Sequence, residues 1–112
     1  MTEGYTIERK EKQCTVLLQG DLTAPLIPDL QAALKKELEQ GAEEAVFDLG
    51  KTRMLDSSGI GLLIAACNSL VRKNGRMRVL NVSEDILRLL QSMRLVSRLH
   101  ASGAAPEEEN HG

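Results

Sequence analysis

The stretch "EAVFDLGKTRMLDSSGIGLLIAAC", residues 44–67, joins a short apolar run to a longer one through a polar segment. Residues 44–49 predict a buried strand, because they are mostly apolar and are followed by turn-forming residues. Beyond a loop at 50–55, apolar residues at spacings of three and four predict a helix over about 58–73, which the Asn-Gly pair at 74–75 ends. A strand that leads through a loop into a helix is typical of α/β folds.

The flanking sequence repeats this alternation. Three more strands are predicted, at 5–10, 14–19 and 76–82. The first two are joined by a polar turn and predict a hairpin. One further helix lies between Thr23, a candidate N-cap, and Gly41, and another follows the N-cap candidate Ser83. The segment "RLVSRLHA", 94–101, fits either a short final strand or a helical turn. The order predicts an α/β fold with a parallel or mixed sheet.

Length and composition indicate one domain. The chain has 112 residues, of which 42% are hydrophobic, and this is enough to build a core without metal or disulfide support. We expect the domain to cover 1–101 and the tail "SGAAPEEENHG", 102–112, to be disordered and acidic. Cys14 and Cys67 have no ligand spacing and are predicted to be buried thiols of a reducing compartment.

Charge and hydropathy argue against two classes of partner. The net charge is −2, the aromatic content is 2%, and no basic patch stands out, so no nucleic-acid partner is expected. The first ten residues are polar and no apolar run is long enough to span a bilayer, so neither a leader nor a membrane partner is expected. We therefore expect a cytoplasmic protein.

The polar group Asp56-Ser57-Ser58 lies where α/β folds place functional residues. A serine hydrolase needs a base, but the chain has only His100 and His111, and it has no G-x-S-x-G motif. A phosphate-binding loop would need a lysine that "DSSGIGLL" lacks. The carboxylates of Asp21, Asp48 and Asp56 have no histidine or cysteine ligands to complete a metal site. The sequence therefore predicts no enzyme, no cofactor and no metal.

The helix that follows predicts two different faces. At about 100° per residue, the apolar side should be core: Ile60, Leu63, Ile64, Cys67, Leu70 and Val71. The other side is small and uncharged: Gly61, Leu62, Ala65, Ala66, Asn68 and Ser69. A solvated face usually carries Lys and Glu, so this side is predicted to bind another protein. The alternative is that a second layer of the same domain covers it.

A phosphate on a serine at this helix start is compatible with the fold. It would face free N–H groups and the positive end of the helix dipole. It would also add nearly two negative charges beside the small, uncharged face. Phosphorylation could therefore switch binding without unfolding the domain.

Residues 47–95, "FDLGKTRMLDSSGIGLLIAACNSLVRKNGRMRVLNVSEDILRLLQSMRL", resemble the STAS domain of bacterial anti-sigma factor antagonists. The D-S-[ST]-G-[IL]-G segment between strand and helix carries the likeness, which extends over about 5–100. The resemblance implies the STAS fold, a mixed four- or five-stranded β-sheet with helices packed mainly on one side. The family usually adds a last strand and helix where this chain continues into its acidic tail, and a short end would favour a homodimer.

The resemblance also implies a function. In the family, the serine after the aspartate, here Ser57, is phosphorylated by a GHKL-type serine kinase that is also the anti-sigma factor. The unphosphorylated antagonist binds that kinase and releases the sigma factor, and a PP2C-type phosphatase resets the phosphorylated form. Asp56 and Gly59 would support the phosphosite, with Ser58 as a secondary site or the helix cap.

Partner-binding positions follow from the same likeness together with the uncharged helix face. They are Asp21, Thr23, Gly61, Leu62, Ala65 and Asn68. The family often has an acidic residue where this chain has Thr23, with Asp21 displaced from it by two residues. Two other readings keep the fold without the switch: an accessory subunit of a transporter ATPase in phospholipid trafficking, or a stressosome-type scaffold.

Overall fold

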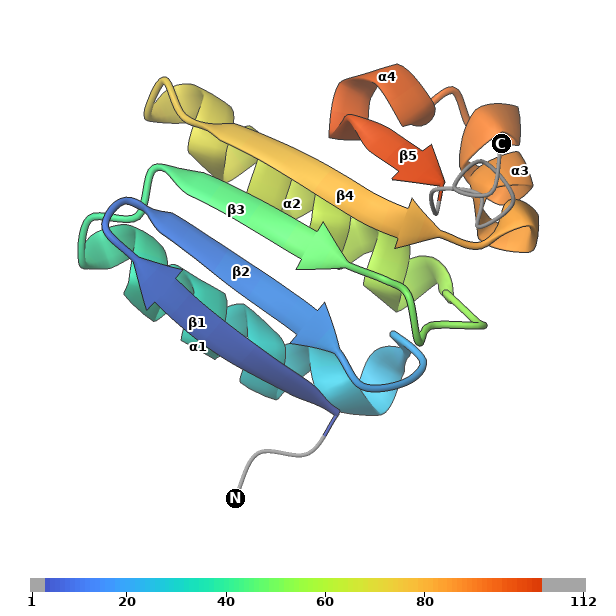
Figure 1. The fold of residues 1–112 in the computed structure, drawn as a ribbon, viewed down its shortest axis with the longest axis horizontal. Coiled ribbons are helices and arrows are strands. Elements are labelled where there is room, and N and C mark those ends of the chain that lie inside the picture. Colours follow the sequence, from blue (N-terminus) through green and yellow to red (C-terminus); the bar gives the residue numbers. More distant parts are fainter. Residues whose placement is uncertain (1–3, 104–112) are drawn as a thin grey trace, which may run out of the picture.

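A five-stranded mixed sheet forms the centre of the computed structural model, which describes residues 4–103 (Figure 1). The strands are β1 (Tyr5–Lys10), β2 (Gln13–Leu18), β3 (Glu44–Asp48), β4 (Arg76–Val82) and β5 (Ala101–Gly103), and they lie in sequence order. β1 and β2 form an antiparallel hairpin, whereas β2, β3, β4 and β5 are parallel. The predicted α/β class, hairpin and mixed sheet are confirmed.

The helices include η1 (Ala24–Leu26), a short 3-10 segment, and α1 (Ile27–Glu39), α2 (Ser57–Arg72), α3 (Glu84–Ser92) and α4 (Val96–Leu99). Figure 1 shows α1 and α2 behind the sheet, with α3 and α4 beside the β5 edge. Ser83 caps α3 through a hydrogen bond from the Ile86 N–H, at 3.3 Å. Gly41 follows α1 with φ +109°, a conformation that favours glycine, as predicted for a helix end.

Aliphatic side chains build the core between the sheet and the helices. In β2 burial alternates, so that Cys14, Val16 and Leu18 face inward while the residues between them are half-buried. Phe47, the one phenylalanine of the chain, is fully buried in β3. Both cysteines are buried and free, and burial is the main cause that raises the pKa of the Cys14 thiol. The predicted buried thiols are confirmed.

The C-terminal segment contains both of the elements between which the sequence left a choice. Val96–Leu99 form one helical turn, and Ala101–Gly103 then pair with β4. The predicted domain boundary after 101 is therefore wrong for Ser102 and Gly103, which belong to β5. The residues of β5 are small or polar and have no apolar alternation that would predict a strand. They form one because the edge of β4 offers them backbone hydrogen-bond partners. The rest of the predicted tail lies outside the described residues.

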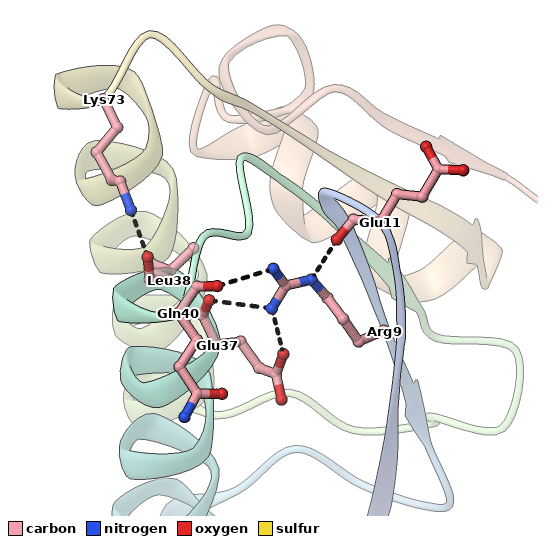
Figure 2. A network of polar contacts seen from close by, with 6 residues as sticks. All are labelled: Arg9, Glu11, Glu37, Leu38, Gln40 and Lys73. Carbon is pink, nitrogen blue, oxygen red and sulfur yellow. Dashed lines mark hydrogen bonds and ion pairs between the residues drawn. The ribbon is translucent and has the colours of Figure 1, made fainter.

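Arg9, on strand β1 of the hairpin, forms hydrogen bonds with the C-terminal end of α1 (Figure 2). Its guanidinium donates to the Glu37 carboxylate at 3.0 Å and to the Gln40 carbonyl at 3.0 Å. The Lys73 ammonium donates to the carbonyl of Leu38 in the same helical turn. Carbonyls at a helix end lack partners within the helix and carry partial negative charge, so two cations there stabilise α1.

Arg9→Met tests this arrangement because it keeps the length of the side chain and removes its donors. We expect the free energy of unfolding to fall by about 1 kcal/mol, since charge-assisted hydrogen bonds at the end of α1 are lost. Urea denaturation followed by circular dichroism measures the change. Lys10→Met is the matched control, because the side chain of Lys10 is exposed and forms no hydrogen bond or ion pair with any residue of 4–103. Equal stability of the two variants would contradict a capping role for Arg9.

Candidate functional site

Asp56 caps two helices at once. Its backbone is extended and its Oδ1 accepts the N–H of Gly59 at 2.9 Å, which makes it the N-cap of α2. Its Oδ2 accepts the N–H of Ala24, also at 2.9 Å, at the start of η1. These hydrogen bonds, first that of Gly59 and then that of Ala24, lower the pKa of the Asp56 carboxyl. The expectation that Ser58 caps the helix is therefore wrong.

Asp56→Ala should lower the midpoint of thermal unfolding at neutral pH, because both helix starts lose an acceptor. The folded-state pKa of Asp56 is depressed, so its contribution is complete above the ordinary aspartate value of about 3.9 and is lost as the pH falls through the folded value. The difference between the two proteins should therefore narrow in acid. Asp56→Asn keeps one acceptor oxygen and should lie between them. A difference that stays constant from neutral pH into acid would contradict a charged cap.

Ser57 is the first residue of α2 and is exposed. Its hydroxyl forms no hydrogen bond with any residue of the described range 4–103, and the two oxygens of Asp56 accept backbone N–H groups instead. Ser58 is half-buried at the next position. Of the two serines singled out by the sequence, Ser57 is thus the more accessible hydroxyl.

The two glycines of the motif have different roles. A Cβ on Gly59 would lie 2.4 Å from the carbonyl oxygen of Leu22, so only glycine lets the start of α2 approach that backbone. A Cβ on Gly61 would meet nothing within 4 Å. Gly59 therefore serves the fold, by close packing and through its N–H to Asp56, whereas Gly61 is an open position on the surface.

The exposed face of α2 differs from the predicted one. Leu62 and Ala66 were expected to face a partner, but they are only 4% and 8% exposed. Val71 was expected in the core and is 61% exposed, and Ile64 is half-buried. The reason is the position of α1, which contacts α2 on the side of Leu62 and Ala66. On the side of Leu62 and Ala66, the alternative interpretation is therefore correct, because another layer of the same domain covers the helix.

Four of the six exposed positions of α2 form a narrow row that begins at Ser57, and the other two, Val71 and Arg72, lie in the last turn of the helix. We call this row the α2 stripe and define it as Ser57, Gly61, Ala65 and Asn68, all exposed and one helical turn apart. It keeps three of the predicted partner-binding positions and loses Leu62. The stripe carries no charged side chain, which is unusual for an exposed helix surface.

Arg98 lies beside the end of the stripe and escaped the sequence analysis. Its guanidinium donates to the Asn68 side-chain oxygen at 2.6 Å, and its carbonyl is 3.5 Å from the Cys67 sulfur. It comes from α4, whose four residues give no helical periodicity. No local signal therefore places this cation next to α2.

Asp21 joins the loop after β2 to the loop before α2. Its Oδ1 accepts the N–H groups of Arg53 and Met54, each at 3.0 Å. The Thr52 hydroxyl, which is buried, adds a bond to the Gly20 carbonyl at 2.8 Å. Thr23 is half-buried at the N-cap of η1, without a capping bond from its side chain. Asp21 and Thr23 are thus brought to the start of α2 by the pairing of the two loops.

Met54 is an apolar residue of the site that the sequence analysis did not single out. It is 58% exposed and stands two residues before the cap of α2. Exposed methionine is common at surfaces that bind other proteins, because its flexible thioether adapts to a partner. Its position directly before "LDSSG" is the signal that could have identified it.

The aspartates that the sequence analysis considered as metal ligands are bonded to backbone N–H groups. Within residues 4–103 no three side chains of His, Cys, Asp or Glu gather in a group that could hold a metal ion. Asp48 accepts the Gly50 N–H at 2.9 Å, so each of the three aspartates considered as ligands is bonded to backbone. Among residues 4–103, every helix is too short or too polar to span a lipid bilayer.

Comparisons with known proteins relate the sequence and the fold of this chain to one family. The model of a family described as "STAS domain" matches residues 5–104. An anti-sigma-B factor antagonist of Staphylococcus epidermidis is 26% identical over 87 residues, which is 78% of this chain and 81% of the relative. The anti-sigma factor antagonist SpoIIAA in its unphosphorylated form has a TM-score of 0.71 at 22% identity, covering 96% of this chain and 94% of the other. The Bacillus cell fate determinant SpoIIAA in the phosphorylated form has a TM-score of 0.75 at 24% identity, covering 96% of both chains.

Proposed function

Because this chain belongs to the STAS domain family, we propose that it is an anti-sigma factor antagonist whose binding to a GHKL-type serine kinase is switched by phosphorylation of Ser57. The kinase is the anti-sigma factor, so the unphosphorylated antagonist binds it and releases the sigma factor. The chain is a ligand and a substrate in this scheme, not the catalyst, and it acts in the cytoplasm with its kinase. The observation that carries the proposal is the free, exposed hydroxyl of Ser57 at the start of the uncharged α2 stripe.

The stripe supplies the docking surface. Gly61 and Ala65 have little or no side chain, so the backbone of a partner helix or loop can approach α2 closely. Ser57 would then lie inside the interface rather than at its edge, since the exposed Met54 precedes it by three residues. Asp21 and Thr23 flank this region from the neighbouring loop.

Phosphorylation exchanges one bond for another. The Ser57 Oγ attacks the γ-phosphorus of ATP held by the kinase, an Oγ–P bond forms, the bond between the γ-phosphorus and the bridging oxygen breaks, and ADP leaves. The hydroxyl proton passes to a base of the kinase, since no described residue of this chain accepts a hydrogen bond from Ser57. A PP2C-type phosphatase reverses the change by hydrolysis.

The free protein should tolerate this phosphate, because it sits at the positive end of a 16-residue helix. The complex should not, since nearly two negative charges would be desolvated against the partner. The negative carboxylate of Asp56 is adjacent and its depressed pKa keeps it charged. The switch thus acts on binding and leaves the fold intact.

Phosphosite mapping tests the acceptor. The protein is incubated with its GHKL-type kinase and ATP, and intact mass and phosphopeptides are measured. We expect one phosphate on the wild type and on Ser58→Ala, and none on Ser57→Ala, because Ser57 is the exposed hydroxyl. Phosphate on Ser58 with Ser57 unmodified would contradict the assignment.

A further inference from the structure

A second surface lies on the outer side of the helix layer, between α1 and α2. It is a groove of about 370 Å³. Its floor is aliphatic: Leu34, Leu38, Leu62, Ala65 and Ala66. Leu34, Leu62 and Ala66 are buried at the bottom of the groove, whereas Leu38 is half-buried and Ala65 is exposed, so a partner's side chains can contact the floor at Leu38 and Ala65. The groove shares Ala65 with the α2 stripe but does not include Ser57.

The rim of the groove is predominantly cationic. Lys35 stands on α1, and Arg72 and Lys73 stand at the end of α2, against the single carboxylate of Glu39. The Lys73 ammonium is engaged with the Leu38 carbonyl. Lys35 and Arg72 are exposed and form no ion pair with any residue in the described range. Two unpaired cations therefore border an aliphatic floor.

From these contacts we infer that the groove between α1 and α2 binds an acidic amphipathic helix of a partner protein. Its apolar side chains would lie on Leu38 and Ala65, and its carboxylates would pair with Lys35 and Arg72. A helix in a groove between two helices is a common recognition mode, in which anchors recur at spacings of three and four. The charge on the rim selects acidic over basic partners and speeds association.

The inference does not depend on phosphorylation of Ser57. No residue of the groove other than Ala65 belongs to the α2 stripe, and Lys35 and Arg72 lie outside it. Charge reversal at these two positions therefore tests the groove alone, while substitution of Ser57 tests the proposed switch alone. Failure of one proposal leaves the other standing.

Selection from a displayed library of helix-forming peptides of about 16 residues tests the inference. The full chain should enrich peptides with a net negative charge and apolar residues at spacings of three and four. The enriched peptides should bind the double variant Lys35→Glu/Arg72→Glu about tenfold more weakly than the wild type. The control variant Lys10→Glu should bind them with the affinity of the wild type. The double variant should itself enrich basic peptides. Amide shifts in NMR should map binding to residues 31–39 and 62–73.

Several outcomes would overturn the inference. They are enrichment of basic or non-amphipathic peptides by the wild type, equal binding to the double variant, and shifts confined to other residues. Sedimentation of the protein without peptide covers a different occupant, since a dimer lost in the double variant would show that a second copy fills the groove. We expect the double variant to fold like the wild type, because Lys35 and Arg72 are exposed and form no ion pair in the described range. Circular dichroism checks this.

Discussion

Ser57→Asp should weaken binding to the kinase by about a hundredfold, or roughly 2.7 kcal/mol, and should leave the fold unchanged. The exposed Ser57 stands at the first position of α2, where an added carboxylate meets the positive helix end in the free protein. In the complex the same carboxylate would lose its water and meet no cation of the stripe, because the stripe is uncharged. Isothermal titration calorimetry measures the affinity, and thermal unfolding measures the fold.

The controls separate charge from shape. Ser57→Asn has nearly the size of Ser57→Asp without its charge, and Ser57→Ala removes only the hydroxyl. Both should bind the kinase within a few-fold of the wild type. If Ser57→Asp binds as well as these two variants, the switch is refuted, and a constitutively docked subunit, such as the accessory protein of a transporter ATPase, becomes the better description.

Gly59→Ala should lower the free energy of unfolding by about 2–3 kcal/mol. The new Cβ would lie 2.4 Å from the Leu22 carbonyl oxygen. That carbonyl cannot simply move away, because Leu22 is bonded through its own N–H to the Met54 carbonyl at 3.1 Å and pairs with Leu55. The start of α2 must shift instead, which strains both hydrogen bonds of Asp56.

Gly61→Ala is the matched control two residues away in the same helix. Nothing lies within 4 Å of its new Cβ, so it should stabilise the protein by up to about 1 kcal/mol, the difference in helix propensity between alanine and glycine. Chemical denaturation compares the pair. Equal effects at both positions would show that α2 does not approach Leu22 as closely as described.

A variant at Gly61 also tests binding to the kinase separately from folding. Gly61→Arg adds a long cation to the α2 stripe without a clash inside the chain, so it should keep the stability of the wild type and weaken binding to the kinase. A variant that binds normally would place the partner on another surface.

Local sequence determined the order of the elements. The hairpin, the strand at 44–49 and the start of α2 follow from apolar periodicity, turn residues and an aspartate before the helix. These signals act over a few residues, and the structure preserves them. The preference for Ser57 over Ser58 came from the family resemblance, to which the structure adds that Ser57 is exposed and Ser58 half-buried.

Tertiary contacts decided which parts of these elements are accessible. A helical wheel gives the angles between residues but not the position of the neighbouring helix. In the structure, α1 packs on the side of Leu62 and Ala66 and buries them, whereas Val71 stays exposed. The second bond of Asp56, to Ala24, and the bond of Arg98 to Asn68 join residues 32 and 30 positions apart. β5 exists because β4 offers a free edge. Such partners are set by packing of the whole chain, which no local pattern encodes.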